Sequence, residues 1–77
     1  MEEKILDILR EIRPDVDFEN ETALIDDGIL ESFDVIQIVT ALMDKFEIYI
    51  DADDIEPENL NNFQAICCLT QSKLSEK

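Results

Sequence analysis

Ser32 is the residue of this chain whose type and position best suit chemistry, because it lies at the predicted start of a helix. A serine nucleophile needs an adjacent base, most often histidine or an amine that can be neutral. The chain contains no histidine, which excludes a Ser-His-Asp triad. The amines lie in segments predicted to be solvated faces or ends: the amino terminus, Lys4, Lys45, Lys73 and Lys77. The sequence therefore predicts that Ser32 is modified by another enzyme, and that the chain is not itself an enzyme.

The predicted helix start gives Ser32 two alternative roles. A helix N-terminus presents unpaired amide groups and a partial positive charge, which suit a phosphate group on the serine. The gain is about 0.3–1 kcal/mol at an exposed terminus, and the carboxylates of Glu31 and Asp34 oppose it. Serine is also a common N-cap, and the local residues alone favour this second interpretation.

The acidic run 51–56 and the cysteine pair do not match a specific metal or redox motif. An EF-hand loop that began with this run would need glycine at its sixth position and glutamate at its twelfth, but Glu56 and Asn62 stand there. Loose, unspecific binding of divalent cations is expected of these carboxylates. Cys67 and Cys68 are adjacent and are the whole cysteine count, so neither a disulfide framework nor a CxxC motif is present.

The length and charge of the chain limit its function. Its 77 residues are expected to form one domain, residues 1–77, which buries only about 60% of the surface of the unfolded chain and leaves little room for an enclosed catalytic pocket. The 20 acidic and 6 basic residues give a net charge of -14. This charge repels nucleic acids and anionic membranes and favours partners with basic surfaces. No apolar stretch approaches the roughly 18 residues of a membrane span, so we expect a cytoplasmic protein with reduced cysteines. We also expect it to be a monomer.

The elements that position Ser32 begin with an amphipathic helix and a long connection. Residues 2–13 have the i, i+3, i+4, i+7 spacing of a helix, and Pro14 ends that helix. Residues 14–31 have no helical period, yet their apolar residues must pack on the core. Gly28 predicts a tight turn or a positive φ before the next helix. The apolar residues of the helix are Ile5, Leu6, Ile8, Leu9 and Ile12, and those of the connection are Phe18, Leu24, Ile25, Ile29 and Leu30.

The second helix, from residue 32 or 33 to residue 46, carries more apolar residues than one core face requires. Phe33, Ile36 and Met43 widen its apolar arc. They are either covered by the loop and a short helix or exposed as partner contacts. The sequence favours cover for Ile36 and Met43, and exposure for Phe33. The predicted core stripe of this helix is Val35, Ile38, Val39, Leu42 and Phe46.

The C-terminal half is predicted to be a packed loop followed by a last helix. Pro57 allows at most one short helix within residues 47–60. Asn61 or Asn62 is a good N-cap for the last helix, with Gln64 in capping-box spacing after Asn61. The fold class is therefore all-α, a small four-helix bundle of three main helices and a short third helix, with a long loop between helices 1 and 2. The last helix has the inner stripe Phe63, Ile66, Cys67, Thr70 and Leu74, and residues 72–77 are expected to fray.

The surroundings of Ser32 carry a family resemblance. Glu31-Ser32-Phe33 begins the second helix, and three runs accompany it in order: Leu24-Ile25-Asp26-Asp27-Gly28-Ile29-Leu30, Ala41-Leu42-Met43-Asp44-Lys45-Phe46 and Asp54-Ile55-Glu56-Pro57-Glu58-Asn59-Leu60. Phe46-Glu47-Ile48-Tyr49-Ile50 follows the helix. Together with the first amphipathic helix, these runs resemble the acyl carrier proteins, whose prosthetic serine sits in an Asp-Ser-Leu motif at the start of their second helix. The resemblance covers nearly the whole chain.

The resemblance implies that a phosphopantetheinyl transferase attaches 4'-phosphopantetheine from coenzyme A to the Ser32 hydroxyl, and that the thiol of this arm holds an acyl or aminoacyl group as a thioester. It also implies a loading ligase and downstream synthase or transferase enzymes with basic surfaces as partners. Fatty-acid or polyketide carriers and aminoacyl carriers, including D-alanyl carriers, stay open as alternatives. The residues expected to contact partner enzymes are Glu31, Phe33, Asp34, Ile36, Met43, Asp44 and Glu47.

Both neighbours of Ser32 depart from the family pattern. Glu31 stands where the family usually has aspartate, and Phe33 stands where it has leucine or methionine. Glutamate keeps the charge, and phenylalanine keeps the apolar character with more bulk, so a different set of partner enzymes is implied. The rival hypothesis from another class is an unmodified acidic helical adaptor that binds a basic protein through the second helix, with Ser32 as a cap.

Overall fold

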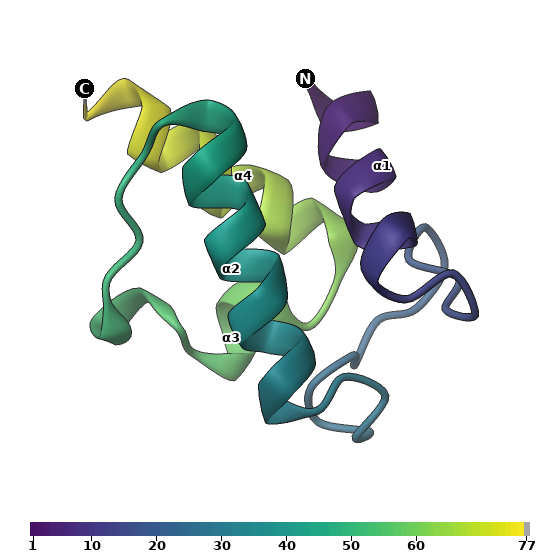
Figure 1. The fold of residues 1–77 in the computed structure, drawn as a ribbon. Helices are drawn as coiled ribbons and strands as arrows, with labels where there is room; N and C mark the ends of the chain where they lie inside the picture. The colour runs from purple at the N-terminus through teal and green to yellow at the C-terminus, as the bar shows by residue number, and fades with distance from the viewer. Residues whose placement is uncertain (77) are drawn as a thin grey trace.

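The computed structural model describes residues 1–76, which fold into four α-helices and one short 3-10 turn (Figure 1). Within this range there is no strand, so the predicted all-α class is confirmed. In Figure 1, α2 crosses the front of the molecule, α4 runs behind it, and α1 packs against both. The elements are α1 (Glu2–Ile12), α2 (Ser32–Phe46), the 3-10 turn (Ala52–Asp54), α3 (Pro57–Leu60) and α4 (Phe63–Ser75).

α1 is amphipathic and ends one residue earlier than predicted. Ile5 and Leu9 are fully buried on its inner face, where they join the core. The amide of Arg13 still donates to the Leu9 carbonyl at 2.9 Å, but Arg13 itself has φ -135° and ψ 82°. A residue that precedes proline is disfavoured from helical geometry, and Pro14 therefore ends the helix. Arg13 is thus a half-buried residue at the exit of α1.

The long connection between α1 and α2 packs on the core, as predicted. Phe18, Leu24 and Leu30 are 1%, 0% and 5% exposed. The connection turns at Gly28, whose φ of 73° lies in the left-handed region that favours glycine. The chain then reaches α2 through Leu30, whose amide donates to the Leu24 carbonyl at 2.9 Å. The segment before Ser32 is therefore a folded part of the domain.

Asn61 and Asn62 have different roles at the start of α4. Asn62 is the N-cap, and its Oδ1 accepts a hydrogen bond from the Ala65 amide at 2.8 Å. The alternative that Asn61 caps α4 with Gln64 is wrong. Asn61 holds the long connection instead, because its carbonyl accepts from the Leu24 amide at 2.8 Å, and its Oδ1 accepts from the next two amides of the connection at 3.0 and 3.1 Å.

Residues 47–60 contain two short helical segments, the 3-10 turn and α3, where at most one was predicted. The sequence pattern hid the first segment because a single turn with no buried residue sets no apolar period. Ile48 and Ile50 are buried on either side of the exposed Tyr49, so the segment packs on the core without a strand partner. Pro57 is the first residue of α3, where its missing N–H removes no helical hydrogen bond.

α4 is longer than predicted, because an ion pair stabilises its last turns. Lys73 Nζ lies 2.8 Å from Asp54 Oδ2, and the Lys73 side chain is only 14% exposed. The expectation that Lys73 is solvated is therefore wrong. The expectation that the helix frays from Ser72 is also wrong, because α4 continues to Ser75. Residue 77, the last of the predicted frayed residues, lies outside the described residues.

Candidate functional site

Ser32 is the first residue of α2, and Glu31 occupies the N-cap position. The Glu31 amide donates to Asp34 Oδ2 at 3.1 Å, which is half of a capping box. The interpretation of Ser32 as the N-cap is therefore wrong. Ser32 is exposed, and across residues 1–76 no hydrogen bond engages its hydroxyl. The serine is free to react with a molecule that approaches the start of α2.

An open groove with a volume of about 290 Å³ lies beside Ser32. It runs between the start of α2 and the segment that leads into α3. Apart from Ser32 and Glu56, the side chains that line it are apolar: Ile25, Val35, Ile36, Ile55, Pro57 and Leu60. The groove therefore offers an apolar surface next to Ser32.

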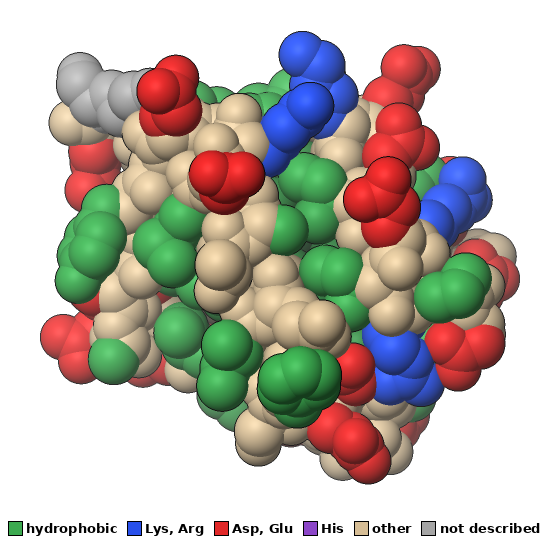
Figure 2. Space-filling view, viewed as in Figure 1, with side chains coloured by type: hydrophobic (Ala, Val, Ile, Leu, Met, Phe, Trp, Pro, Cys, Tyr) green, Lys and Arg blue, Asp and Glu red, His purple; other side chains and the backbone are tan. Residues whose placement is uncertain are grey.

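Two large apolar side chains on α2 are exposed near Ser32. Phe33 is 69% exposed, as predicted, but Ile36 is 59% exposed, so the predicted cover of Ile36 is wrong. The reason is that the segment leading into α3 lines the far side of the groove and leaves Ile36 uncovered. Met43 is half-buried against the core, which confirms its predicted cover. Figure 2 shows hydrophobic side chains beside acidic ones at the lower end of the front face, where α2 begins.

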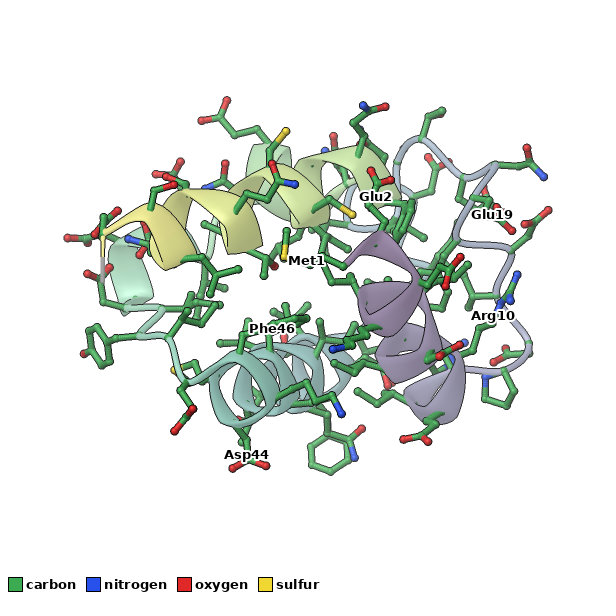
Figure 3. The ribbon with its side chains drawn as sticks, turned by 90° about the horizontal axis from the view of Figure 1, so that it is seen from above. Met1, Glu2, Arg10, Glu19, Asp44 and Phe46 are labelled. Atoms are coloured by element: carbon green, nitrogen blue, oxygen red, sulfur yellow. The ribbon has the colours of Figure 1, made fainter. Side chains whose placement is uncertain are left out.

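The carboxylates expected to contact partners divide into three exposed residues and one internal residue. Glu31, Asp44 and Glu47 are exposed, and Figure 3 shows Asp44 directed away from the other helices. Asp34 is only 8% exposed, so the expectation that it lies on the partner surface is wrong. Glu47 ends α2 with φ 54° and ψ 47°, a left-handed conformation that strains residues other than glycine.

Arg13 is the partner that draws Asp34 inward, and the sequence reasoning missed it. Arg13 Nη1 donates to Asp34 Oδ2 at 2.6 Å and to the Ile29 carbonyl at 3.1 Å. Arg13 Nε and Nη2 donate to the two oxygens of Asp15 at 3.0 and 2.9 Å. The hydrogen bonds to Asp15 and to Asp34 raise the pKa of Arg13. One available signal was an arginine directly before proline at a helix end, where a fixed side chain can reach the next element.

Neither Lys73 nor Cys67 supplies a base or a nucleophile for this site. The hydrogen bond to Asp54 raises the pKa of Lys73, so this amine stays charged at neutral pH. Burial raises the pKa of the Cys67 thiol to about 11, so this thiol stays protonated. In residues 1–76 no group of three or more metal-ligating side chains is placed to hold an ion. Ser32 therefore remains the functional candidate.

Comparisons with models of protein families, with curated proteins and with solved structures gave no match to this chain. None of the helices formed by residues 1–76 has the length and apolar character needed to cross a membrane. Function is therefore inferred from the side chains around Ser32 and from the sequence segments that surround them.

Proposed function

We propose that this chain is a carrier protein that bears a 4'-phosphopantetheine arm on Ser32 and holds an acyl or aminoacyl group on it. The single observation that carries the proposal is the exposed, unbonded hydroxyl of Ser32 at the first position of a 15-residue helix. The amides of the first helical turn and the helix dipole suit a phosphodiester at this point. The absence of histidine, with Lys73 held as a cation, supports modification of this serine over catalysis by it.

The residues around Ser32 fit such an arm. Ser32 is exposed, and it lines the apolar groove of about 290 Å³. When bound, the group would supply a thiol that holds its cargo as a thioester. Ser32 would supply the attachment oxygen, and Val35 and Ile36 would supply apolar contact along the groove. We also propose that the packing of α1, α2 and α4 with the short α3 is the four-helix bundle of carrier proteins.

The surface around Ser32 has features that suit the binding of partner enzymes. The proposed partners are a phosphopantetheinyl transferase, a loading ligase, and downstream synthase or transferase enzymes. Phe33 and Ile36 provide exposed apolar area, and Asp44 and Glu47 provide negative charge farther along α2. Partners with basic surfaces would be attracted to a chain of net charge -14 with fast, salt-sensitive association. Such cytoplasmic partners would recognise α2 and the start of the helix together.

The proposal is tested by measuring the intact mass of the chain after incubation with coenzyme A and a broad-specificity phosphopantetheinyl transferase. We expect a gain of one phosphopantetheine, which Ser32→Ala abolishes. Ser72→Ala is the matched control, because Ser72 is an exposed serine on α4, and this variant should still be modified. A folded wild-type chain that gains no mass, or a gain that survives in Ser32→Ala, would refute the carrier function.

The adaptor hypothesis is the second candidate, and the exposure of Phe33 and Ile36 favours it. An adaptor needs no covalent arm and would bind a basic protein through this apolar area and the acidic residues around it. It predicts that Ser32→Ala binds such a partner as tightly as the wild-type chain, whereas Phe33→Asp does not. The mass experiment separates the two candidates, because only the carrier acquires a prosthetic group on Ser32.

A further inference from the structure

Arg13 connects the end of α1 to both sides of Ser32. Its Nη1 donates to the carbonyl of Ile29, three residues before the serine, at 3.1 Å, and to the carboxylate of Asp34, two residues after it, at 2.6 Å. The same Asp34 oxygen accepts from the amide of Glu31 at 3.1 Å. One guanidinium and one carboxylate therefore fix three positions that bracket Ser32, while the serine itself stays exposed.

These contacts lie outside the apolar core. α1 and α2 pack on each other through buried apolar residues, among them Leu9, Ile38 and Leu42, each at most 1% exposed. The Arg13 side chain is 26% exposed, so it lies at the edge of the contact between α1 and α2 and not within the core. The core can therefore hold the two helices together without Arg13. What Arg13 adds is a fixed path for the backbone from the Ile29 carbonyl into the first turn of α2.

The geometry requires an arginine. Nη1 serves Asp34 and the Ile29 carbonyl, while Nε and Nη2 hold both oxygens of Asp15 at 3.0 and 2.9 Å. A planar guanidinium directs its donors in fixed directions, whereas a lysine ammonium is a point charge on a flexible stem. Lysine keeps the positive charge and loses the simultaneous contacts. Arg13→Lys therefore separates the role of charge from the role of geometry.

We propose that Arg13 is a positioning residue for the modification of Ser32: it holds the Ile29 to Asp34 segment so that the serine hydroxyl is presented in one fixed place. The inference rests on the proposed function, because it concerns the transfer of phosphopantetheine to Ser32. In that transfer the Ser32 oxygen forms a bond to the phosphorus next to the pantetheine of coenzyme A, 3',5'-ADP leaves, and the serine proton passes to the transferase or to solvent. The reaction needs the oxygen in line with the leaving group, and a small displacement costs rate.

The test compares the steady-state kinetics of a broad-specificity phosphopantetheinyl transferase on full-length chains, with the carrier as the varied substrate. We expect Arg13→Lys to lower kcat about tenfold with KM within about twofold, because the exposed docking residues are unchanged while the oxygen is misplaced. Asp34→Asn, which removes the negative charge that Arg13 binds, should also lower kcat. Arg10→Lys is the matched control, since it makes the same substitution on α1 at an exposed arginine that pairs with Glu19 and with no residue of the Ile29 to Asp34 segment, and its kcat should stay within about twofold.

A stability control excludes a general loosening of the fold. Ile66→Val, in the core of α4, should lower the melting temperature without lowering kcat. The positioning role is overturned if Arg13→Lys has the kcat of wild type. It is also overturned if Ile66→Val, with a melting temperature equal to that of Arg13→Lys, loses as much kcat as Arg13→Lys does. If the wild-type chain is never modified, the proposed function fails and the positioning role fails with it.

Amide hydrogen exchange gives a readout that does not depend on the transferase. In Arg13→Lys we expect the Glu31 amide to exchange about tenfold faster than in wild type, because its acceptor on Asp34 is no longer held. The amides of Ile66 and Leu69 in α4 should keep their wild-type rates. Equal exchange at Glu31 in both chains would overturn the proposal, even where the kinetic result agreed with it.

Discussion

Reversing the charge of Asp34 is the sharpest test of this structure against the expectation that Asp34 is a surface residue. Asp34 is 8% exposed, and its Oδ2 accepts from Arg13 Nη1 at 2.6 Å and from the Glu31 amide at 3.1 Å. A hydrogen bond to a charged group contributes about 1.5–3 kcal/mol. A lysine here loses the bonds of the carboxylate and meets a like charge, which costs about 3–5 kcal/mol. This cost equals the whole stability of about 3–5 kcal/mol expected for so small a domain.

We therefore expect Asp34→Lys to be largely unfolded at room temperature, as measured by far-UV circular dichroism with thermal and urea melts. Asp34→Ala, at a cost of about 2 kcal/mol, should lower the melting temperature by about 8–16 °C. Asp44→Lys is the matched control, because Asp44 is exposed on the same helix, and the substitution changes the net charge by the same two units, from -14 to -12. Its stability should stay within about 0.5 kcal/mol of wild type.

The result that would refute the reasoning is an Asp34→Lys chain that melts within about 3 °C of Asp44→Lys. The carboxylate of Asp34 would then lie on the surface, and the bond to Arg13 would not exist in solution. If the expected result is found, the loading kinetics of Asp34→Lys report unfolding and say nothing about partners. Charge contacts with partner enzymes must then be tested at Asp44.

Three further predictions follow from exposure, backbone strain and charge. Phe33→Ala should leave the melting temperature nearly unchanged and lower kcat/KM for the transferase about tenfold, because Phe33 is 69% exposed and is a large apolar side chain next to Ser32; unchanged kinetics would remove Phe33 from the contact surface. Glu47→Gly should raise the melting temperature by about 2–6 °C, because it relieves a left-handed conformation at φ 54°; a lower melting temperature would contradict the strain. The neighbouring Glu58 carboxyl raises the pKa of Glu56 above its ordinary 4.5, so the folded state binds this proton more tightly than the unfolded chain, and ionisation opposes folding as pH rises through the folded pKa. Glu56→Gln should therefore raise the melting temperature at pH 7 but not below about pH 4.5, and an equal gain at both pH values would contradict the cause.

Much of the fold follows from local patterns that a sequence displays directly. The apolar spacing of residues 2–13 and 32–46 predicted α1 and α2 to within one residue, because a helix needs one apolar face wherever it packs. Gly28 predicted a tight turn or a positive φ, and the structure has a φ of 73° there. The exposure of Phe33 could also be predicted, because it lies off the stripe that defines the core face.

Three of the errors share one physical cause, because each depends on which distant residues meet. Ile36 was expected to be covered, but whether a segment covers a helical position depends on where that segment runs. Lys73 was expected to be solvated, but its partner Asp54 lies 19 residues away and 2.8 Å distant. Asn61 was one of two candidate caps, with Asn62, and it instead holds a loop that precedes it by more than 30 residues. Periodicity and capping signals carry no information about such meetings.

For the candidate site, the sequence by itself determined that a serine stands at the start of an apolar-rich helix, in an acidic chain that contains no histidine. Only the tertiary structure decided that Glu31 is the cap, that the Ser32 hydroxyl is exposed beside an apolar groove, and that Asp34 faces inward to Arg13. The physical reason is that residue types and local spacing govern helix formation, whereas the environment of a side chain depends on the packing of segments far apart in the chain. Ser32 therefore owes its place on the helix to the sequence and its accessibility to the fold.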